Sequence, residues 1–248
     1  MKNTHPSRFT PALAAVTLSL LAFTTSAHAA TLSYNTTQPS VGVDDISNFT
    51  GTTTDGGNVS GGPDDSTYVA AGRGPIGQTF TTGSNVGGYT LTAISLQQAT
   101  YDQWQDTQAV TFTVRVGTFS GTTLTPTLTE TVATTLTDLN RPAGTGFSAG
   151  SGNFLTVTLS APVTLAANTS YFFDLGVTAG GNYYIETNGT SVSSTYTGGE
   201  AYHTNLNGTT MTPDTGDHVF IASMTAISAI PEPSTYGIAA GGLALVGA

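Results

Sequence analysis

The feature that most constrains the fold of this chain is an alternation of apolar and polar residues that recurs through its middle. Three segments show it most clearly: 110–116, 154–160 and 171–177. In the first of these, the apolar side chains alternate with Thr111, Thr113 and Arg115. Successive side chains of a β-strand point to opposite faces of a sheet, so each segment predicts a strand with one buried and one solvated face. We expect these side chains to be buried: Phe112, Val114, Val157, Phe173 and Leu175.

Further candidate strands complete an all-β interpretation. They are the segments 77–82, 89–97, 127–136, 182–187 and 217–227. In the second of these the apolar phase changes between Leu91 and Ile94, which predicts a bulge or a bend in the strand. No stretch between the two ends of the chain has the 3.6-residue apolar stripe of a helix. Eight or nine strands separated by glycine-rich turns predict an antiparallel two-sheet sandwich, with a jelly roll as the leading topology.

The first 29 residues are typical of a secretory signal peptide. Lys2 and Arg8 supply a positive start, the apolar segment 11–23 follows, and Ala27 and Ala29 form an A-x-A cleavage pattern. The apolar segment is shorter than the roughly 20 residues that a membrane span requires. We therefore expect a signal helix that export machinery and signal peptidase recognise and remove.

Charge and cysteine content exclude several classes of partner and chemistry. Without the signal, the chain has three arginines, no lysine and fifteen acidic residues, which gives a net charge of −12. Nucleic acid and anionic membranes bind clustered cations, so neither is an expected partner. The chain has no cysteine, which excludes disulfides, thiolate metal sites and a cysteine nucleophile.

The C-terminal segment PEPSTYGIAAGGLALVGA resembles the PEP-CTERM sorting signal of exosortase systems. Pro231, Glu232 and Pro233 match its motif, and the apolar run 236–248 matches its membrane segment. The resemblance implies export, a transient inner-membrane tether and processing by an exosortase-like enzyme. The run would rise about 20 Å as a helix, against roughly 30 Å of hydrocarbon, and the arginine-rich end of such signals is missing. We therefore expect a short C-terminal apolar helix and a truncated or degenerate signal.

A second resemblance concerns the folded part. GPIGQTFTTGSNVGGYTLTAISLQ, APVTLAANTSYFFDLGV, YTGGEAY and DHVFIASM follow one another in this order. Over about 68–227 the chain is similar to the choice-of-anchor β-sandwich domains of bacterial surface proteins. The resemblance implies a jelly-roll or carbohydrate-module-like fold and no particular activity. The expected organisation is a signal peptide (1–29), a strand and loop (30–66, with Leu32 and Tyr34 in the strand), a sandwich (67–228) and a sorting signal (229–248).

Candidate catalytic groups are few. GTFSG around Ser120 is not a nucleophile-elbow motif. Two carboxylates facing each other across a cleft hydrolyse glycosides, and Asp174 and Glu186 are the central candidates. Because Asp174 alternates with Tyr171 and Phe173, we expect it to point outward into solvent. We therefore predict that the domain is not an enzyme.

Metal binding has two candidate sets of ligands. The first, His203, His218, Asp214 and Asp217, matches no established ligand spacing, and we expect these histidines to be solvated. The second is a possible structural calcium site that uses acidic loop residues: Asp44, Asp45, Asp64 and Asp65. The spacing of these acidic residues does not follow that of a known calcium loop. The alternative is that they lie in solvated turns. We expect no other cofactor.

The only tryptophan lies in QQATYDQWQDTQ, between two predicted strands. Aromatic rings surrounded by amides and carboxylates hold sugars by stacking and hydrogen bonding, so one prediction is a glycan contact made by Tyr101, Gln103, Trp104 and Asp106. The alternative is that Trp104 folds back and covers the end of the sandwich.

These features predict a protein that acts at the cell surface or outside the cell. The leading interpretation is a structural or matrix component associated with exopolysaccharide or a biofilm. The alternatives are a non-catalytic glycan-binding module and, third, a secreted glycan-active enzyme.

Overall fold

The structure is a computed structural model that describes residues 29–48, 73–97, 109–135, 151–179, 187–188, 196–214 and 216–229. These residues form strands and turns and contain no helix. It follows that no helix within these ranges is long and apolar enough to cross a membrane. The expected signal helix and C-terminal apolar helix lie outside the described residues.

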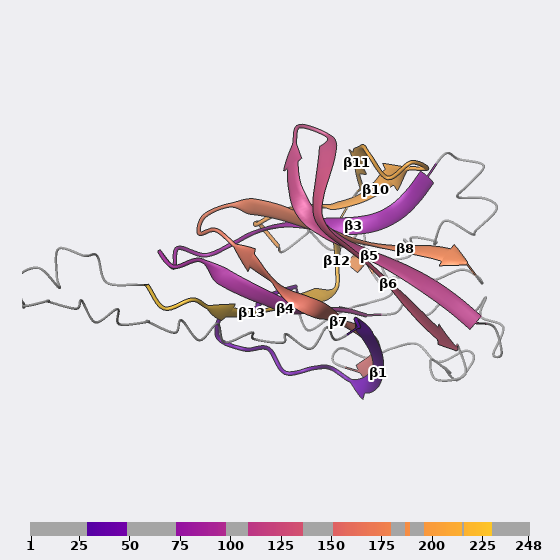
Figure 1. Ribbon diagram of the computed structural model, residues 1–248, viewed down its shortest axis with the longest axis horizontal. Coiled ribbons are helices and arrows are strands. Elements are labelled where there is room, and N and C mark those ends of the chain that lie inside the picture. Colours follow the sequence, from indigo (N-terminus) through magenta and orange to yellow (C-terminus); the bar gives the residue numbers. More distant parts are fainter. Residues whose placement is uncertain are drawn as a thin grey trace, which may run out of the picture.

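Two antiparallel sheets pack face to face, as Figure 1 shows. The first has the order β1 (Thr31–Thr37), β7 (Ser151–Leu165), β4 (Tyr89–Gln97), β13 (Phe220–Ala226) and β2 (Ile46–Ser47). The second has the order β11 (Met211–Pro213), β10 (Ala201–Asn205), β3 (Arg73–Thr81), β8 (Ser170–Ala179), β5 (Ala109–Ser120) and β6 (Thr123–Thr135). A short pair joins β9 (Thr187–Asn188) to β12 (Asp217–His218). The predicted two-sheet sandwich is confirmed, and strands from the segment 30–66 belong to it.

The order of the strands is that of a jelly roll. Strand β5 pairs with β6, β4 with β7, β3 with β8 and β2 with β13. Each pair encloses the previous one in the sequence, as in one long hairpin rolled into two sheets. Strand β1 extends the first sheet, and β10 with β11 extends the second.

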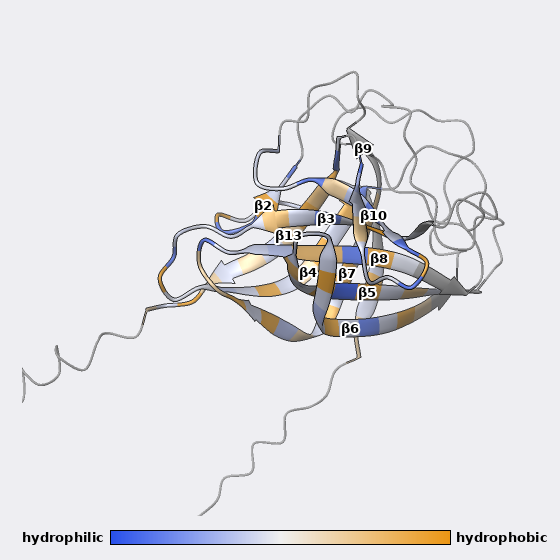
Figure 2. Cartoon of the chain, turned by 90° about the horizontal axis from the view of Figure 1, so that it is seen from above, coloured by the Kyte–Doolittle hydropathy of each residue, from blue (hydrophilic) through white to orange (hydrophobic). Residues whose placement is uncertain are grey.

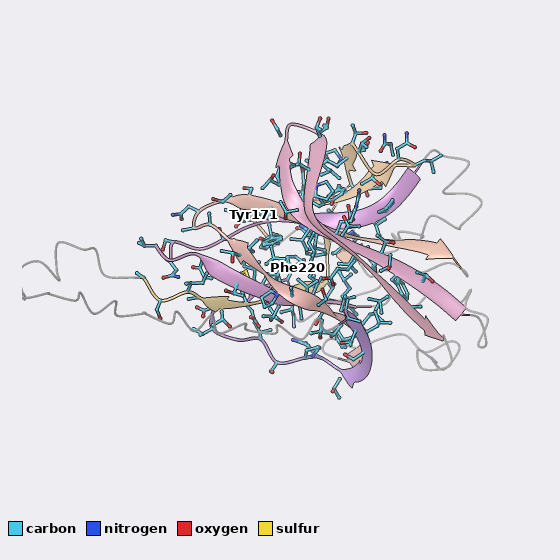
Figure 3. All side chains as sticks on the ribbon, in the orientation of Figure 1. Tyr171 and Phe220 are labelled. Atoms are coloured by element: carbon cyan, nitrogen blue, oxygen red, sulfur yellow. The ribbon has the colours of Figure 1, made fainter. Side chains whose placement is uncertain are left out.

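The core lies between the sheets and consists of the apolar faces that the alternation predicts. Phe112, Val114, Val157, Phe173 and Leu175 are all buried, as expected. Figure 3 places Tyr171, of the second sheet, and Phe220, of the first, in this interior. In Figure 2 hydrophobic and hydrophilic residues alternate along β5, β6 and β8, which is the sequence pattern seen in space.

The predicted irregularity in β4 is also confirmed. The register of β4 with β7 shifts between Leu91 and Ala93, and the register of β13 with β4 shifts between Ser223 and Met224. A bulge lets both Leu91 and Ile94 reach the core although their spacing is odd.

Polar side chains connect the two sheets along both sides of the sandwich. On one side the Glu130 carboxylate accepts hydrogen bonds from the Ser160 backbone and hydroxyl. On the other side Gln78 donates to Asp217 (2.8 Å) and accepts from the His218 backbone N–H (2.9 Å). Asn48 in turn donates to the His218 carbonyl, so this chain of bonds runs from β3 to the end of β2.

The two ends of the sandwich differ. At one, which we call the turn end, the short connections 82–88 and 166–169 hydrogen-bond to each other through Thr82 and Asn168. At the other, the loop end, lie the strand ends that flank the connections 49–72, 98–108 and 136–150. The chain leaves β13 at the turn end, where the Ile227 backbone N–H donates to the Gly88 carbonyl.

Candidate functional site

A row of residues across the outer face of the second sheet contains the most concentrated polar chemistry in the described part of the chain. In register order it runs from Tyr202 of β10 through Gly77 of β3 and Asp174 of β8 to Arg115 of β5. Period-2 alternation puts these residues on the face opposite the core.

Asp174 and Arg115 form a two-pronged ion pair. Arg115 Nε donates to Asp174 Oδ1 at 2.8 Å, and Arg115 Nη2 donates to Asp174 Oδ2 at 2.5 Å. The third guanidinium nitrogen, Nη1, donates to the Gly208 carbonyl in the turn after β10. The planar guanidinium matches the carboxylate in this fork geometry, which lysine would not reproduce.

Tyr202 completes the cluster by crossing over Gly77. Its hydroxyl lies 3.2 Å from both Asp174 Oδ2 and the Phe173 carbonyl. A Cβ at Gly77 would lie 2.5 Å from the Tyr202 hydroxyl and 2.3 Å from the Phe173 carbonyl oxygen. Glycine is therefore required at this position for the ring to lie against β3.

A small apolar cluster covers these polar groups. It consists of Leu124, Phe172, Tyr202 and Met211, with Phe119 packed against it. The tip of the β5–β6 hairpin bends toward the β10–β11 turn (Figure 1), and the Thr123–Thr210 bridge joins the two. The Leu124 and Met211 N–H groups donate to carbonyls across this junction. The outer face of the second sheet thus carries its own small core.

Asp174 is consequently buried, with 1% of its surface exposed. The expectation that it points into solvent is wrong: the alternation gave the correct face, but β10, β11 and the hairpin tip cover that face. Both carboxylate oxygens are engaged by Arg115 and Tyr202. The other candidate carboxylate of a glycosidase pair, Glu186, lies outside the described residues.

Burial dominates the electrostatics of the cluster. It raises the pKa of the Asp174 carboxyl, and hydrogen bonds from Arg115 and Tyr202 oppose that rise. Burial also raises the pKa of the Tyr202 hydroxyl well above its ordinary value, and the Asp174 charge adds to this effect. For Arg115, burial lowers the pKa, but bonding to Asp174 outweighs it and the pKa is raised. The cluster is a neutralised, hydrogen-bonded clamp, and such an arrangement can fix the position of the hairpin tip.

The four residues of the first candidate metal set lie in two places. His203 Nδ1 is 2.8 Å from Asp214 Oδ1. Asp217 bonds instead to Gln78, and burial raises the pKa of its carboxyl. His218 is fully buried in β12, so the expectation that it is solvated is wrong. Within the described ranges, no three metal-binding side chains form a group.

Asp44 and Asp45, expected as calcium ligands, accept backbone hydrogen bonds. Asp45 Oδ1 accepts from the Met224 N–H at 2.7 Å, and Asp44 Oδ2 accepts from the Ala226 N–H at 2.9 Å. The other Asp45 oxygen accepts from the Gly42 N–H. The two carboxylates therefore continue the pairing of β13 beyond the two-residue strand β2, a role that the sequence pattern did not suggest.

Most of the other predicted site residues lie outside the described ranges. These are Tyr101, Gln103, Trp104 and Asp106 of the glycan set, Asp64 and Asp65 of the calcium set, Ala27 of the cleavage pattern, and Pro231, Glu232 and Pro233 of the sorting motif. Ala29 is described and exposed, two residues before β1. The glycan set lies in the connection 98–108, whose flanking residues Gln97 and Ala109 belong to the loop end.

Comparisons of the chain with family models, with curated proteins and with solved structures found no match.

Proposed function

We propose that this chain is an exported, exosortase-sorted protein of the cell surface or extracellular matrix, associated with exopolysaccharide or a biofilm. The observation that carries the proposal is the position of the chain exit. Asn85 and Gly88 hold Ile227 at the turn end, four residues before the Pro-Glu-Pro motif. The strand ends that flank the long connections lie at the opposite end. A chain tethered through its C-terminus would therefore present the loop end outward.

The contacts of the charged groups support display rather than catalysis. Asp174, Asp217, Asp44 and Asp45 all accept hydrogen bonds from the protein itself. A general acid or base has to exchange a proton with a reacting group of the substrate. Carboxylates that already accept hydrogen bonds from the protein are poorly placed for that exchange.

Intact-mass analysis of the protein secreted by an exosortase-bearing host tests the proposal. We expect loss of the segment through Ala29 and loss of the apolar run 236–248. The matched control replaces Pro231, Glu232 and Pro233 with alanine, and this variant should keep its tail and remain with the membrane fraction. Secreted protein that still carries 236–248 would overturn the sorting proposal.

A glycan-binding role is the second candidate, favoured by the position of Gln97 and Ala109 at the end that faces outward. On this proposal Trp104→Ala abolishes retention on the bacterium's own polysaccharide and leaves the melting temperature nearly unchanged. A large loss of stability would instead identify Trp104 as part of the core. Hydrolysis of the polysaccharide by the purified protein would refute the non-catalytic proposal.

A further inference from the structure

Exposed valines gather around the point where the chain leaves the sandwich. Of the four large hydrophobic side chains that are exposed in the described residues, three lie at the turn end: Val41 (43%), Val43 (99%) and Val86 (89%). The fourth, Leu206, lies in the turn after β10.

Hydrogen bonds fix both valine-bearing loops to the last residues of β13 and its exit. Asp44, next to Val43, accepts from the Ala226 N–H. Gly88, two residues after Val86, accepts from the Ile227 N–H, and Asn85 donates to the Ile227 carbonyl. The two loops thus flank the exit from both sides, and Val43 and Val86 share one end of the molecule.

The chain beyond the exit limits what this end can face. Seven residue steps separate Ala229 from Tyr236, where the apolar run begins, and a fully extended chain covers at most about 3.6 Å per residue. The turn end therefore lies within roughly 25 Å of whatever holds the apolar run. The two carboxylates that follow Val43, those of Asp44 and Asp45, already accept backbone N–H groups, which reduces the cost of placing them near an apolar phase.

We propose that the turn end is a lipid-contact surface, with Val43 and Val86 entering the interface of a zwitterionic bilayer while the apolar run is held in it. This inference rests on the proposed tether. Burying part of a valine side chain removes apolar surface from water and is favourable, so two valines contribute measurably to a short apolar anchor. With a net charge of −12 after signal removal, contact with anionic lipid should be weaker.

Single-site labelling tests the proposal, because the chain has no cysteine. Val43→Cys, Val86→Cys, Leu206→Cys and Leu243→Cys are each introduced into the full chain without its signal and labelled with an environment-sensitive fluorophore. With phosphatidylcholine vesicles we expect blue-shifted emission from labels at 43, 86 and 243 and none from 206. Val43→Ser with Val86→Ser should weaken vesicle partitioning about fivefold to tenfold, whereas Leu206→Ser should not change it.

Each other outcome counts against a stated part of the idea. If the label at 243 shifts and those at 43 and 86 do not, the lipid-contact surface is wrong and the tether survives. If the label at 243 does not shift, tether and surface both fail. A shift at 43 and 86 that grows with protein concentration without vesicles would show that a second copy covers these residues. Stronger partitioning into vesicles containing phosphatidylserine would overturn the apolar mechanism.

Discussion

Arg115 holds a buried carboxylate that has no other cationic partner among the described contacts. Replacing it with methionine keeps the bulk and removes the charge, so Asp174 is left buried without its counter-ion. We expect Arg115→Met to lower the free energy of unfolding by about 3–5 kcal/mol in urea titrations. The double variant Arg115→Met, Asp174→Leu should recover a large part of that loss. Thr129→Ala, in the same register row but exposed, is the control and should change stability by less than about 0.5 kcal/mol. If Arg115→Met and Thr129→Ala lower the free energy of unfolding by similar amounts, the ion pair does not stabilise the fold as proposed.

The pH dependence of stability follows from Asp174 and Asp217. Burial raises the pKa of both carboxyls above the ordinary 3.8, so the folded chain binds more protons than the unfolded chain above that value. Their contribution to stability is present at low pH and is lost as the pH rises through the raised pKa values. We expect a larger free energy of unfolding at pH 5 than at pH 7.5, by denaturant titration. Asp174→Asn with Asp217→Asn should flatten the profile, and a steady fall from pH 7.5 to pH 5 in the unmodified protein would contradict the assignment.

The close packing around Gly77 can be tested by comparing an alanine substitution there with one at Gly121, which serves as the control. Gly77→Ala would place a methyl group against the Phe173 carbonyl and the Tyr202 ring, neither of which can move freely. We expect a loss of about 3 kcal/mol or more and a change in the near-ultraviolet circular dichroism of the tyrosines. Gly121→Ala has open space around it and only its positive φ of 57° to oppose it, so about 1 kcal/mol is expected. The packing account is wrong if the two losses are equal.

These residues also show the limit of sequence pattern at this scale. The alternation placed Asp174 and Arg115 on the outer face of their strands, which is correct. It carried no information on what covers that face, because the cover combines the tip of the β5–β6 hairpin with β10 and β11, which follow Asp174 by about thirty residues. The signal that would have helped is compositional: after signal removal Arg115 is one of three cations, and it lies in the middle of a strand.

At the scale of elements, the edge of β13 is closed by the side chains of Asp44 and Asp45, which directly precede β2. Asp45→Ala would expose the Met224 N–H, and we expect a loss of about 1–2 kcal/mol together with faster aggregation in light-scattering assays. Asp45→Asn retains an acceptor oxygen and should lose less. If the alanine and asparagine variants lose equal stability and aggregate equally fast, the hydrogen bond from the Met224 N–H does not protect this edge.

The long strands were predictable and the short ones were not. Strands β4, β5, β7 and β8 each direct an apolar face into the core: β5 and β7 keep the period of two throughout, β4 keeps it on either side of its bulge, and β8 keeps it although its outer face is also covered. In β10 the neighbouring residues Ala201 and Tyr202 are both buried, because this strand has covered groups on both sides. Its sequence, AYHTN, therefore has no alternation to read. The segment 217–227, predicted as one strand, is divided at Val219 into β12 and β13, since it passes from the side of the sandwich into the first sheet.

At the scale of the whole molecule, the last strand is an interior one. Strand β13 lies between β4 and β2, which precede it by more than a hundred residues. A chain that ends after Asp214 therefore lacks an interior strand of the first sheet, and β2 loses its only partner there. We expect it to give no cooperative thermal transition, whereas a chain that ends after Ala229 should melt within a few degrees of the full chain. A cooperative transition from the shorter chain would show that the first sheet closes without β13.

The jelly-roll topology was predictable as a class because strand number, antiparallel turns and the absence of helical stripes leave few architectures. The order of strands in each sheet was not. Pairing of β2 with β13 or β3 with β8 depends on contacts between residues about one hundred or more positions apart, which local periodicity does not encode. The choice of the turn end for the chain exit follows from that order alone.

The direction of β13 has a mechanical consequence. The strand runs toward the turn end, so tension on a held C-terminus acts along its length. Its register pairs with β4, from Phe220 with Leu96 to Ala226 with Tyr89, have hydrogen bonds perpendicular to that pull. The load is then shared by many bonds in shear instead of opening them one at a time. A domain held by its C-terminus would carry a pulling force through this interior strand.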